Sequence, residues 1–149
     1  MAGSAVTAPA PSVQRITGGC LCKRVRYEIS AEPIAMRLCW CRDCQYFASG
    51  NATVNVVFPS DALHIQGELR DFQSVADSGN RMHRRFCPEC GTQLFSASEA
   101  RPHLVIVRNG TLDDTALLKP GAIIWTASAP EWAWIDESIP RHAGQPPPA

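Results

Sequence analysis

The sequence lacks any apolar run long enough to span a membrane as a helix. Its longest uninterrupted apolar stretches cover only a few residues, as in 121–125 (GAIIW), whereas a spanning helix needs about 20. An excess of charge is missing too, since 14 lysines and arginines stand against 14 aspartates and glutamates. Without a net field there is little to attract nucleic acid or anionic lipid. We therefore expect neither a membrane span nor a nucleic-acid partner.

Features of a secretory signal are also missing from the first dozen residues. The segment 1–12 is small and proline-rich, with neither a basic start nor an apolar centre, so we expect a reducing, cytoplasmic setting. Hydrophobic residues at 45% and charged residues at 19% are typical of a globular protein. We expect a flexible leader over 1–12, a single domain over 13–141 and a flexible tail over 142–149.

Hydrophobic and polar residues alternate along most of the domain, which is the period of β-strands. This pattern predicts short strands at 25–29, 54–58, 63–65, 69–72, 82–86 and 104–107. The turn residues Ser78, Gly79 and Asn80 predict a hairpin tip between two of these strands. Helical signals are limited to a turn or two after Cys44 and to 113–118, which begins with an acidic pair. The predicted class is mainly β.

Seven cysteines, an odd number, are the most informative residues of the chain. They form three clusters: Cys20 and Cys22; Cys39, Cys41 and Cys44; Cys87 and Cys90. In a reducing compartment, clustered thiols are more often metal ligands or catalytic groups than disulfides. The last cluster, Cys-Pro-Glu-Cys-Gly, has the pattern of a zinc knuckle. Its proline presets the turn, and Gly91 can take the left-handed conformation that lets its N–H approach sulfur.

Two ligand arrangements fit these clusters, because a closed structural zinc site needs four ligands. In the first, Cys20 and Cys22 join the knuckle, and the three cysteines of 39–44 hold a second ion with one open position. In the second, two cysteines of 39–44 complete the knuckle site, and Cys20 and Cys22 are left over. We favour the first, because it uses all seven cysteines and yields one closed and one open site. That difference separates structural from catalytic zinc.

Several motifs occur together in one order and spacing along the chain. They are Gly18-Gly19-Cys20-x-Cys22-x-x-Val25-x-Tyr27, Cys-x-Cys-x-x-Cys at 39–44, Arg85-Phe86-Cys87-x-x-Cys90-Gly91-x-x-Leu94-Phe95, Gly110-Thr111-Leu112-Asp113, and Trp125 followed by Pro130-x-Trp132. Over residues 14–140 the chain resembles the glutathione-dependent formaldehyde-activating enzyme family, which includes the centromere protein V domain. The resemblance implies an Mss4-like fold, a β-tent of twisted antiparallel sheets. It also implies a structural zinc on Cys20, Cys22, Cys87 and Cys90 and a catalytic zinc on Cys39, Cys41 and Cys44.

The same resemblance implies an enzyme of the carbon–sulfur lyase type that condenses glutathione with formaldehyde. The chemistry of an open three-thiolate zinc agrees, because a thiol bound there loses its proton and can add to an aldehyde carbon. Such an electron-rich site favours a soft sulfur nucleophile over strong activation of water. We therefore expect glutathione, or another small thiol, and a small aldehyde as substrates. The alternatives are a non-enzymatic zinc module that binds a partner protein, and iron in place of zinc at the thiolates.

Two positions depart from the family pattern. Family members commonly carry histidine where this chain has Trp40, between the first two cysteines of 39–44, and where it has Ile123. Both positions lie in or near motifs expected to line the active site. We therefore expect the metal frame to be kept and a carbonyl compound other than formaldehyde to be preferred.

Other side chains carry weaker signals. Asp43 could orient a ligand or take a proton, although a solvated loop carboxylate is the simpler interpretation. Some arginines could hold the carboxylates of a glutathione-like thiol, but each is expected on the surface, and strand alternation places 84 and 85 on opposite faces. These arginines are Arg42, Arg81, Arg84 and Arg85. The histidines, expected to be structural or surface residues, are His64, His83, His103 and His142; the tryptophans, expected in the core with one against the pocket, are Trp125, Trp132 and Trp134.

Overall fold

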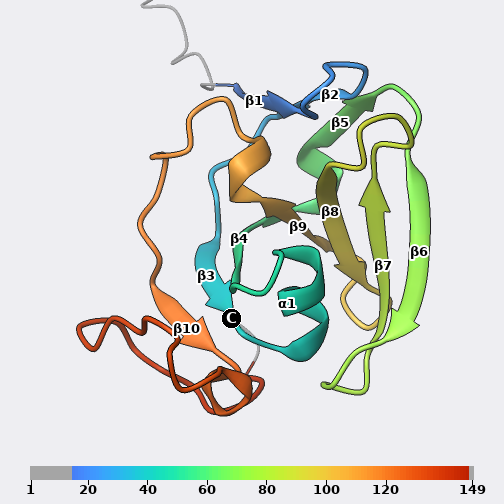
Figure 1. Ribbon diagram of the computed structural model, residues 1–149. Helices are drawn as coiled ribbons and strands as arrows, with labels where there is room; N and C mark the ends of the chain where they lie inside the picture. The colour runs from blue at the N-terminus through green and yellow to red at the C-terminus, as the bar shows by residue number, and fades with distance from the viewer. Residues whose placement is uncertain (1–14, 148–149) are drawn as a thin grey trace, which may run out of the picture.

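A small sheet of three antiparallel strands lies at the top of the molecule (Figure 1). The computed structural model describes residues 15–147, and in this part of the chain the small sheet has the order β1-β2-β5. Its strands are β1 (Ile16–Gly19), β2 (Arg26–Ile29) and β5 (Leu63–Gln66). Cys20 and Cys22 lie in the turn between β1 and β2. The leader expected over 1–12 lies outside the described residues.

A larger sheet of seven strands crosses the molecule in the order β10-β3-β4-β9-β8-β7-β6 (Figure 1). Its strands are β3 (Ala35–Cys39), β4 (Thr53–Pro59), β6 (Arg70–Val75), β7 (Arg81–Phe86), β8 (Gln93–Ser98), β9 (Leu104–Arg108) and β10 (Ala122–Ile124). All neighbours are antiparallel except β10 and β3, which run parallel. The predicted mainly β fold of antiparallel sheets is confirmed, with one parallel pair at an edge, which the long connection before β10 makes possible.

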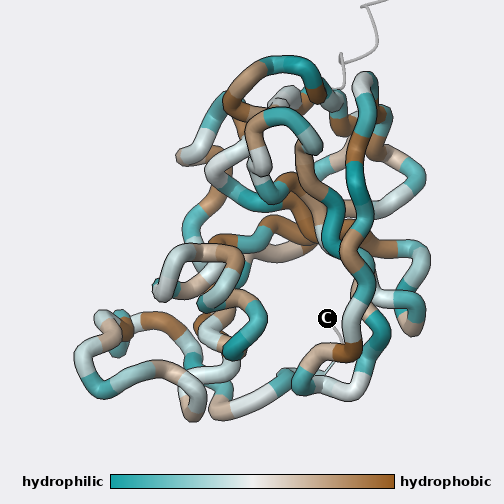
Figure 2. Tube along the Cα trace, turned by 45° about the vertical axis from the view of Figure 1, so that its right-hand side comes forward, coloured by the Kyte–Doolittle hydropathy of each residue, from teal (hydrophilic) through white to brown (hydrophobic). Residues whose placement is uncertain are grey.

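The hydrophobic core lies between the two sheets. Alternate residues of each strand face it, as a period of two requires; Val56 and Phe58 of β4 and Val105 and Val107 of β9 are all buried in it. Each such side chain contributes about 1.5–3 kcal/mol by leaving water. Figure 2 shows hydrophobic segments of the trace gathered in the middle of the upper part of the molecule. The intervening residues of the same strands face the opposite side of the large sheet, where the candidate site lies.

One short helix, α1 (Arg42–Phe47), stands in front of the large sheet beside β3 and β4 (Figure 1). The side chain of Cys41 accepts the backbone N–H of Cys44 and caps the start of the helix. The helix therefore begins at Arg42, ahead of the position predicted after Cys44. Gln45 is buried and donates to the backbone oxygens of Trp40 and Ser128. These two hydrogen bonds tie α1 to the C-terminal segment.

The helix expected over 113–118 is wrong. Its residues form turns and bends that follow η2 (Asn109–Thr111). The N–H of Asp113 donates to the backbone oxygen of Thr17, and its carboxylate binds Arg26 and Thr17. Tertiary contacts therefore use the acidic group that would otherwise have stabilised a helix N-terminus.

The six predicted strands correspond to β2, β4, β5, β6, β7 and β9, and the hairpin tip at 78–80 is confirmed. Ala76 and Asn80 are hydrogen bonded there, and Gly79 has a φ of +84°. The pattern does not predict β1, β3, β8 or β10. Strand β1 ends in two glycines, one of which lies against another backbone segment: a Cβ on Gly18 would approach the backbone oxygen of Thr111 to 2.3 Å. Strand β10 has only three residues, too few to show alternation.

The C-terminal segment returns to β10 and the short η3 (Thr126–Ser128). The N–H of His142 donates to Ile123, that of Thr126 to His142, and the indole of Trp125 to Gln145. The described part of the expected tail thus lies against the domain up to at least Gln145. Among the described residues, no helix is long and apolar enough to cross a membrane.

Candidate active site and metal centres

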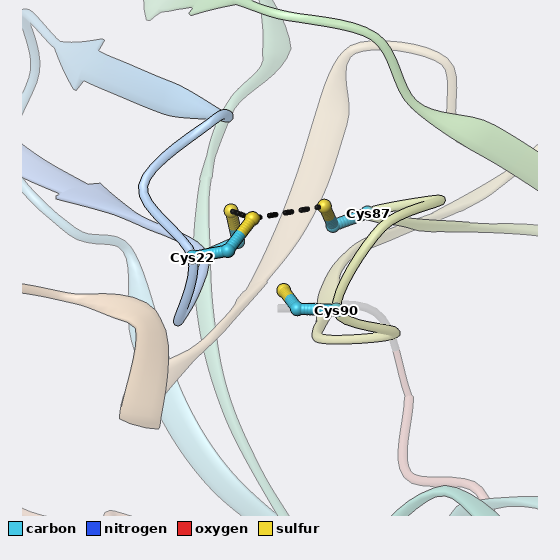
Figure 3. Close-up of side chains that lie close together, drawn as sticks. Cys22, Cys87 and Cys90 are labelled. Atoms are coloured by element: carbon cyan, nitrogen blue, oxygen red, sulfur yellow. Dashed lines mark hydrogen bonds between the residues drawn. The ribbon is translucent and has the colours of Figure 1, made fainter.

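Four cysteines from two distant turns meet between the two sheets. Cys20 and Cys22 come from the β1–β2 turn, and Cys87 and Cys90 from the β7–β8 turn. Their sulfur atoms all lie within 4.8 Å of one another; the Cys20–Cys22 distance is 3.5 Å and the Cys22–Cys87 distance 3.7 Å. Figure 3 shows the side chains of Cys22, Cys87 and Cys90 pointing toward one another from their two loops. We call these four residues the tetrad.

Backbone N–H and hydroxyl groups around the tetrad lie within hydrogen-bonding distance of its sulfurs. The N–H of Val25 donates to the sulfur of Cys20 at 3.3 Å. The hydroxyl of Thr92 lies 3.1 Å from the sulfur of Cys90. Hydrogen bonds from this hydroxyl first, and then from the backbone of Thr92 and Cys22, lower the pKa of the Cys90 thiol to about 5. Gly91 has the predicted left-handed conformation, with a φ of +73°. Its N–H, however, donates to the backbone oxygen of Cys87 rather than to sulfur.

The other three cysteines form a second group, the triplet, at the junction of β3 and α1. Cys39 is the last residue of β3, Cys41 precedes α1 and Cys44 lies in its first turn. Their sulfurs also lie within 4.8 Å of one another, and all three residues are buried. The structure thus brings the seven cysteines together in the two sets favoured from the sequence. The second arrangement, in which cysteines of 39–44 join the knuckle, is not the one observed.

Electrostatics in the triplet favour negative charge on sulfur at one position. Hydrogen bonds from Cys39 and Cys41 lower the pKa of the Cys44 thiol, and the Arg108 guanidinium and the Thr53 hydroxyl lower it further. Hydrogen bonding and burial raise the pKa of Cys39 in turn. Arg108 is therefore a fixed positive charge beside the three thiols.

Both sets fit a thiophilic metal ion. Sulfurs bound tetrahedrally at the usual Zn–S distance of about 2.3 Å lie about 3.8 Å apart, close to the separations measured in the tetrad. All seven cysteines are free thiols, with no disulfide among the described residues. N–H donors to sulfur at Cys20 and Cys41 would also stabilise metal-bound thiolates. The chain therefore has two cysteine clusters capable of holding a metal ion.

A pocket borders Cys87 of the tetrad, and a separate cavity of about 360 Å³ opens beside the triplet. All three triplet cysteines line one end of it. Its floor is the face of the large sheet opposite the core, made by alternate residues of five neighbouring strands. Trp125 and Ile124 form one wall, and the β6–β7 hairpin tip forms another. Trp125 has a φ of +59°, a costly conformation for a bulky residue, and packs against the triplet.

Positive charge is concentrated in this cavity. Arg84 is only 3% exposed and Arg108 9%, so the expectation that Arg84 is a surface charge is wrong. Arg84 donates to Ser74 and to the carboxylate of Asp43 at 3.2 Å, which gives that carboxylate of α1 a partner instead of leaving it solvated. Alternation is confirmed, because the Arg85 guanidinium lies over the ring of the core residue Phe95. The burial of Arg84 could not be predicted from the sequence, because alternation does not show which face of β7 borders a cavity.

Three further residues that line the cavity are not predicted as site residues from the sequence. Arg37, Asn55 and Arg108 line the floor, and no motif marks them. Only Arg108 could have been found from the sequence pattern. The predicted strand 104–107 continues one residue further, to Arg108, which lies on the same face as Leu104 and Ile106. Arg37 lies in β3, which the pattern does not predict.

The two departures from the family pattern do not lie on the cavity wall. Trp40 is 2% exposed and packs edge-on against Trp132, and Ile123 is fully buried; neither lines the cavity. Both positions do lie in motifs that line the cavity, through their neighbours Cys39, Cys41 and Ile124, but neither side chain is itself part of the lining. Trp125 does line the cavity as expected, but Trp132 and Trp134 are 68% and 92% exposed, so their predicted core packing is wrong.

The histidines take no part in the metal clusters. His83 of β7 binds Asp71 and Glu99 on the exposed side of the sheet, and His103 lies on the cavity's edge, exposed to solvent. Within residues 15–147, the groups of metal-ligating side chains consist of cysteines alone. This agrees with the expectation that the histidines are structural or surface residues.

Comparison with known proteins places this geometry in a family. The family model described as glutathione-dependent formaldehyde-activating enzyme matches residues 15–128. The fold is similar to the crystal structure of a Rhodobacter sphaeroides protein, a structural genomics target, with a TM-score of 0.54 and 20% identity over 70% of this chain and 91% of that chain. No curated protein matches the sequence. Since the family model covers most of its length, the chain belongs to the glutathione-dependent formaldehyde-activating enzyme family.

Proposed function

We propose that the chain is a zinc-dependent enzyme that makes or breaks a carbon–sulfur bond between a small thiol and a small aldehyde. One observation carries the proposal: the triplet supplies only three ligands and lines a cavity of about 360 Å³, whereas the tetrad supplies a full set of four ligands. A ligand set that a substrate can reach suits a reacting centre, and a closed set suits a structural one. Membership of a family named as an enzyme supports the same conclusion.

The proposed roles of the two cysteine sets differ accordingly. Cys20, Cys22, Cys87 and Cys90 hold a structural zinc, and Cys39, Cys41 and Cys44 hold a catalytic one. A set of four thiolates is a common structural zinc site, and three protein ligands with one open position are common in catalytic sites. When bound at the triplet, zinc would supply a positive centre that holds a substrate thiol in its deprotonated form.

The cavity's own residues would serve the rest of the reaction. Addition joins the thiol sulfur to the carbonyl carbon, and the carbonyl oxygen takes up the proton that the thiol gives up. Ile124 and Trp125 form an apolar wall beside the triplet and would keep water away from the adduct. The buried guanidinium of Arg108 adds positive potential beside the triplet, which favours the thiolate form of sulfur there. Cleavage of the adduct would use the same groups in reverse.

Metal analysis combined with kinetics tests this proposal. We expect two zinc ions per chain, one for each cysteine cluster, and formation of thiol–aldehyde adducts faster than the uncatalysed rate in exchange NMR. The Cys41→Ala variant should carry one zinc and show only the uncatalysed rate. As a control, Ser30→Ala, outside both clusters and the cavity, should keep both ions and the full rate.

The outcomes separate the competing functions. Two bound zinc ions without acceleration for any thiol and aldehyde would contradict the enzyme and favour a module that binds a partner protein. A red or brown protein would contradict zinc, because iron–thiolate sites absorb visible light.

A further inference from the structure

Three polar residues form a row across the floor of the cavity. Arg37 of β3 lies opposite Asn55 of β4, and Asn55 lies opposite Arg108 of β9. All three line the cavity. Arg108 donates to the side-chain oxygen of Asn55, whose amide donates in turn to Thr53 at 3.1 Å. The row thus presents two guanidinium groups, one on each side of an amide that orients Arg108.

The row lacks a negative partner of its own. Among the described residues, neither Arg37 nor Arg108 forms an ion pair with a carboxylate, whereas Arg84 has Asp43. Asp77 is the one acidic residue among those that line the cavity. Arg108 makes a single side-chain hydrogen bond. Its other side-chain nitrogens keep some exposure, since none of them is fully buried without a partner. Its remaining N–H groups are therefore open to a ligand in the cavity.

A buried guanidinium without a carboxylate is costly unless an anion compensates it. With a divalent metal bound, the three thiolates of the triplet would leave one net negative charge in the same cavity, which offsets part of the positive charge of Arg108. Arg37 lies on the far side of Asn55 and extends the positive charge along the floor. The row therefore carries more positive charge than the protein groups around it balance.

We propose that Arg37, Asn55 and Arg108 form a subsite for a carboxylate carried by the thiol substrate. Arg37 lies two residues before Cys39 on the same face of β3, a distance of about 7 Å along a strand. A carboxylate bound at the row would thus lie a few bonds from a sulfur atom at the triplet. Arginine suits this role, because its planar N–H groups match the two oxygens of a carboxylate. This inference rests on the proposed function and adds selection of the thiol by its charge.

A matched pair of thiols tests the subsite on the full-length, zinc-loaded protein. N-acetylcysteine carries a carboxylate, and N-acetylcysteine amide is its neutral counterpart. We expect calorimetry to show that the wild type binds the acid at least tenfold more tightly, since a charged hydrogen bond of this kind is worth about tenfold or more in affinity. Equal affinities for the two thiols would overturn the proposal.

Substitutions assign the selectivity to the row. Arg37→Gln should lower the affinity for the acid about tenfold and leave the amide within about twofold. The nearly isosteric Asn55→Asp should do the same, because it provides a carboxylate inside the protein for both arginines. Arg108→Gln is a further variant, but its burial makes the two others the decisive ones. The control Arg85→Gln removes an arginine that lies over Phe95 on the other face of the sheet and should change neither affinity.

Three readouts separate this proposal from its rivals. If Arg37→Gln and Asn55→Asp weaken both thiols equally and lower the zinc content, the row only stabilises the metal site, and the proposal fails. The subsite could instead hold the carboxylate of the carbonyl compound. In that case the wild type will favour glyoxylate over acetaldehyde and bind the two thiols equally well, and the proposal also fails. If the acid is selected in binding but no thiol–aldehyde pair is turned over, the subsite stands and the proposed reaction fails.

Discussion

The carboxylate of Asp113 joins the segment after η2 to the neighbouring strands β1 and β2, which lie far away in sequence. It accepts two hydrogen bonds from the guanidinium of Arg26, at 3.1 and 2.5 Å, and one from the hydroxyl of Thr17 at 2.6 Å. These donors, Arg26 first, lower the pKa of Asp113 to about 2. The connection fixes the segment after η2 against the small sheet, where the sequence pattern favours a helix instead.

Asp113→Asn tests this connection. About half of each side chain remains exposed, so we expect a loss of about 0.5–1 kcal/mol in the free energy of unfolding at pH 7. Because the pKa is lowered on folding, the stabilisation is present above the ordinary aspartate pKa of about 4 and is lost as pH falls toward 2. Urea unfolding of both proteins at pH 7, 4 and 2.5 should show the difference shrinking. A difference that stays constant over this range would contradict the assignment.

Glu28→Gln is the matched control at this scale. Glu28 pairs with Arg15 on the same small sheet at 3.1 Å, and both side chains are more than half exposed. It has a single ion-pair partner and no additional hydroxyl donor. We expect its replacement to change the free energy of unfolding by less than that of Asp113, at about 0–0.5 kcal/mol.

Among the secondary-structure elements, His83 links the strands β6, β7 and β8. Its Nδ1 lies 2.6 Å from the carboxylate of Asp71 on β6, and its Nε2 lies 2.9 Å from that of Glu99, just after β8. Hydrogen bonds to these two carboxylates, Asp71 first, raise the pKa of His83. A protonated ring can donate to both carboxylates at once, and a neutral ring to only one of them.

This arrangement predicts a pH dependence of opposite sign to that of Asp113. A pKa that is raised on folding contributes stability that is complete below the ordinary histidine pKa of about 6.5 and is lost as pH rises through the folded value. The melting temperature of the wild type relative to His83→Gln should therefore be highest near pH 5.5 and converge above pH 8. NMR titration of the His83 ring gives the folded pKa directly. A value below about 6.5 would contradict the prediction.

The triplet belongs to a single local unit, β3 followed by α1. Its three ligands lie within six residues, so a bound metal closes only short loops and constrains little of the unfolded chain. We expect Cys41→Ala to lose one metal ion and to lower the melting temperature by only a few degrees, mainly because α1 loses its N-terminal cap. Differential scanning calorimetry checks this shift. A collapse of the fold would mean that both metal sites are structural.

The tetrad acts on the whole molecule, because it joins the small sheet to the large one. Cys22 and Cys87 are 65 residues apart in sequence and 3.7 Å apart between sulfurs. Metal binding there contributes directly to folding free energy, since the four ligands are far apart in the unfolded chain. Cys87→Ser should therefore give an unfolded or aggregating protein. A soluble variant with an unchanged melting temperature would contradict the structural role, and Cys41→Ala is its natural comparison.

Much of the fold and of the cysteine grouping could be predicted from the sequence, because both depend on local or additive features. Alternation predicts strands such as β4 and β9, and the Cys-Pro-x-Cys-Gly turn predicts the conformation of Gly91. The favoured division of the seven cysteines follows from counting ligands. Short or glycine-rich strands such as β10 and β1 are not predicted, because they have too few alternating residues to show a period.

What the sequence by itself determined is a mainly β chain with two cysteine sets able to bind metal. Only the tertiary structure decided which face of each strand borders the core and which borders the cavity. Alternation places Arg84 and Arg85 on opposite faces, but it cannot say that Arg84 is the buried one. The row of Arg37, Asn55 and Arg108 exists only through the register of three strands that are distant in sequence. Register and sheet order arise from packing between sheets, and no local pattern contains that information.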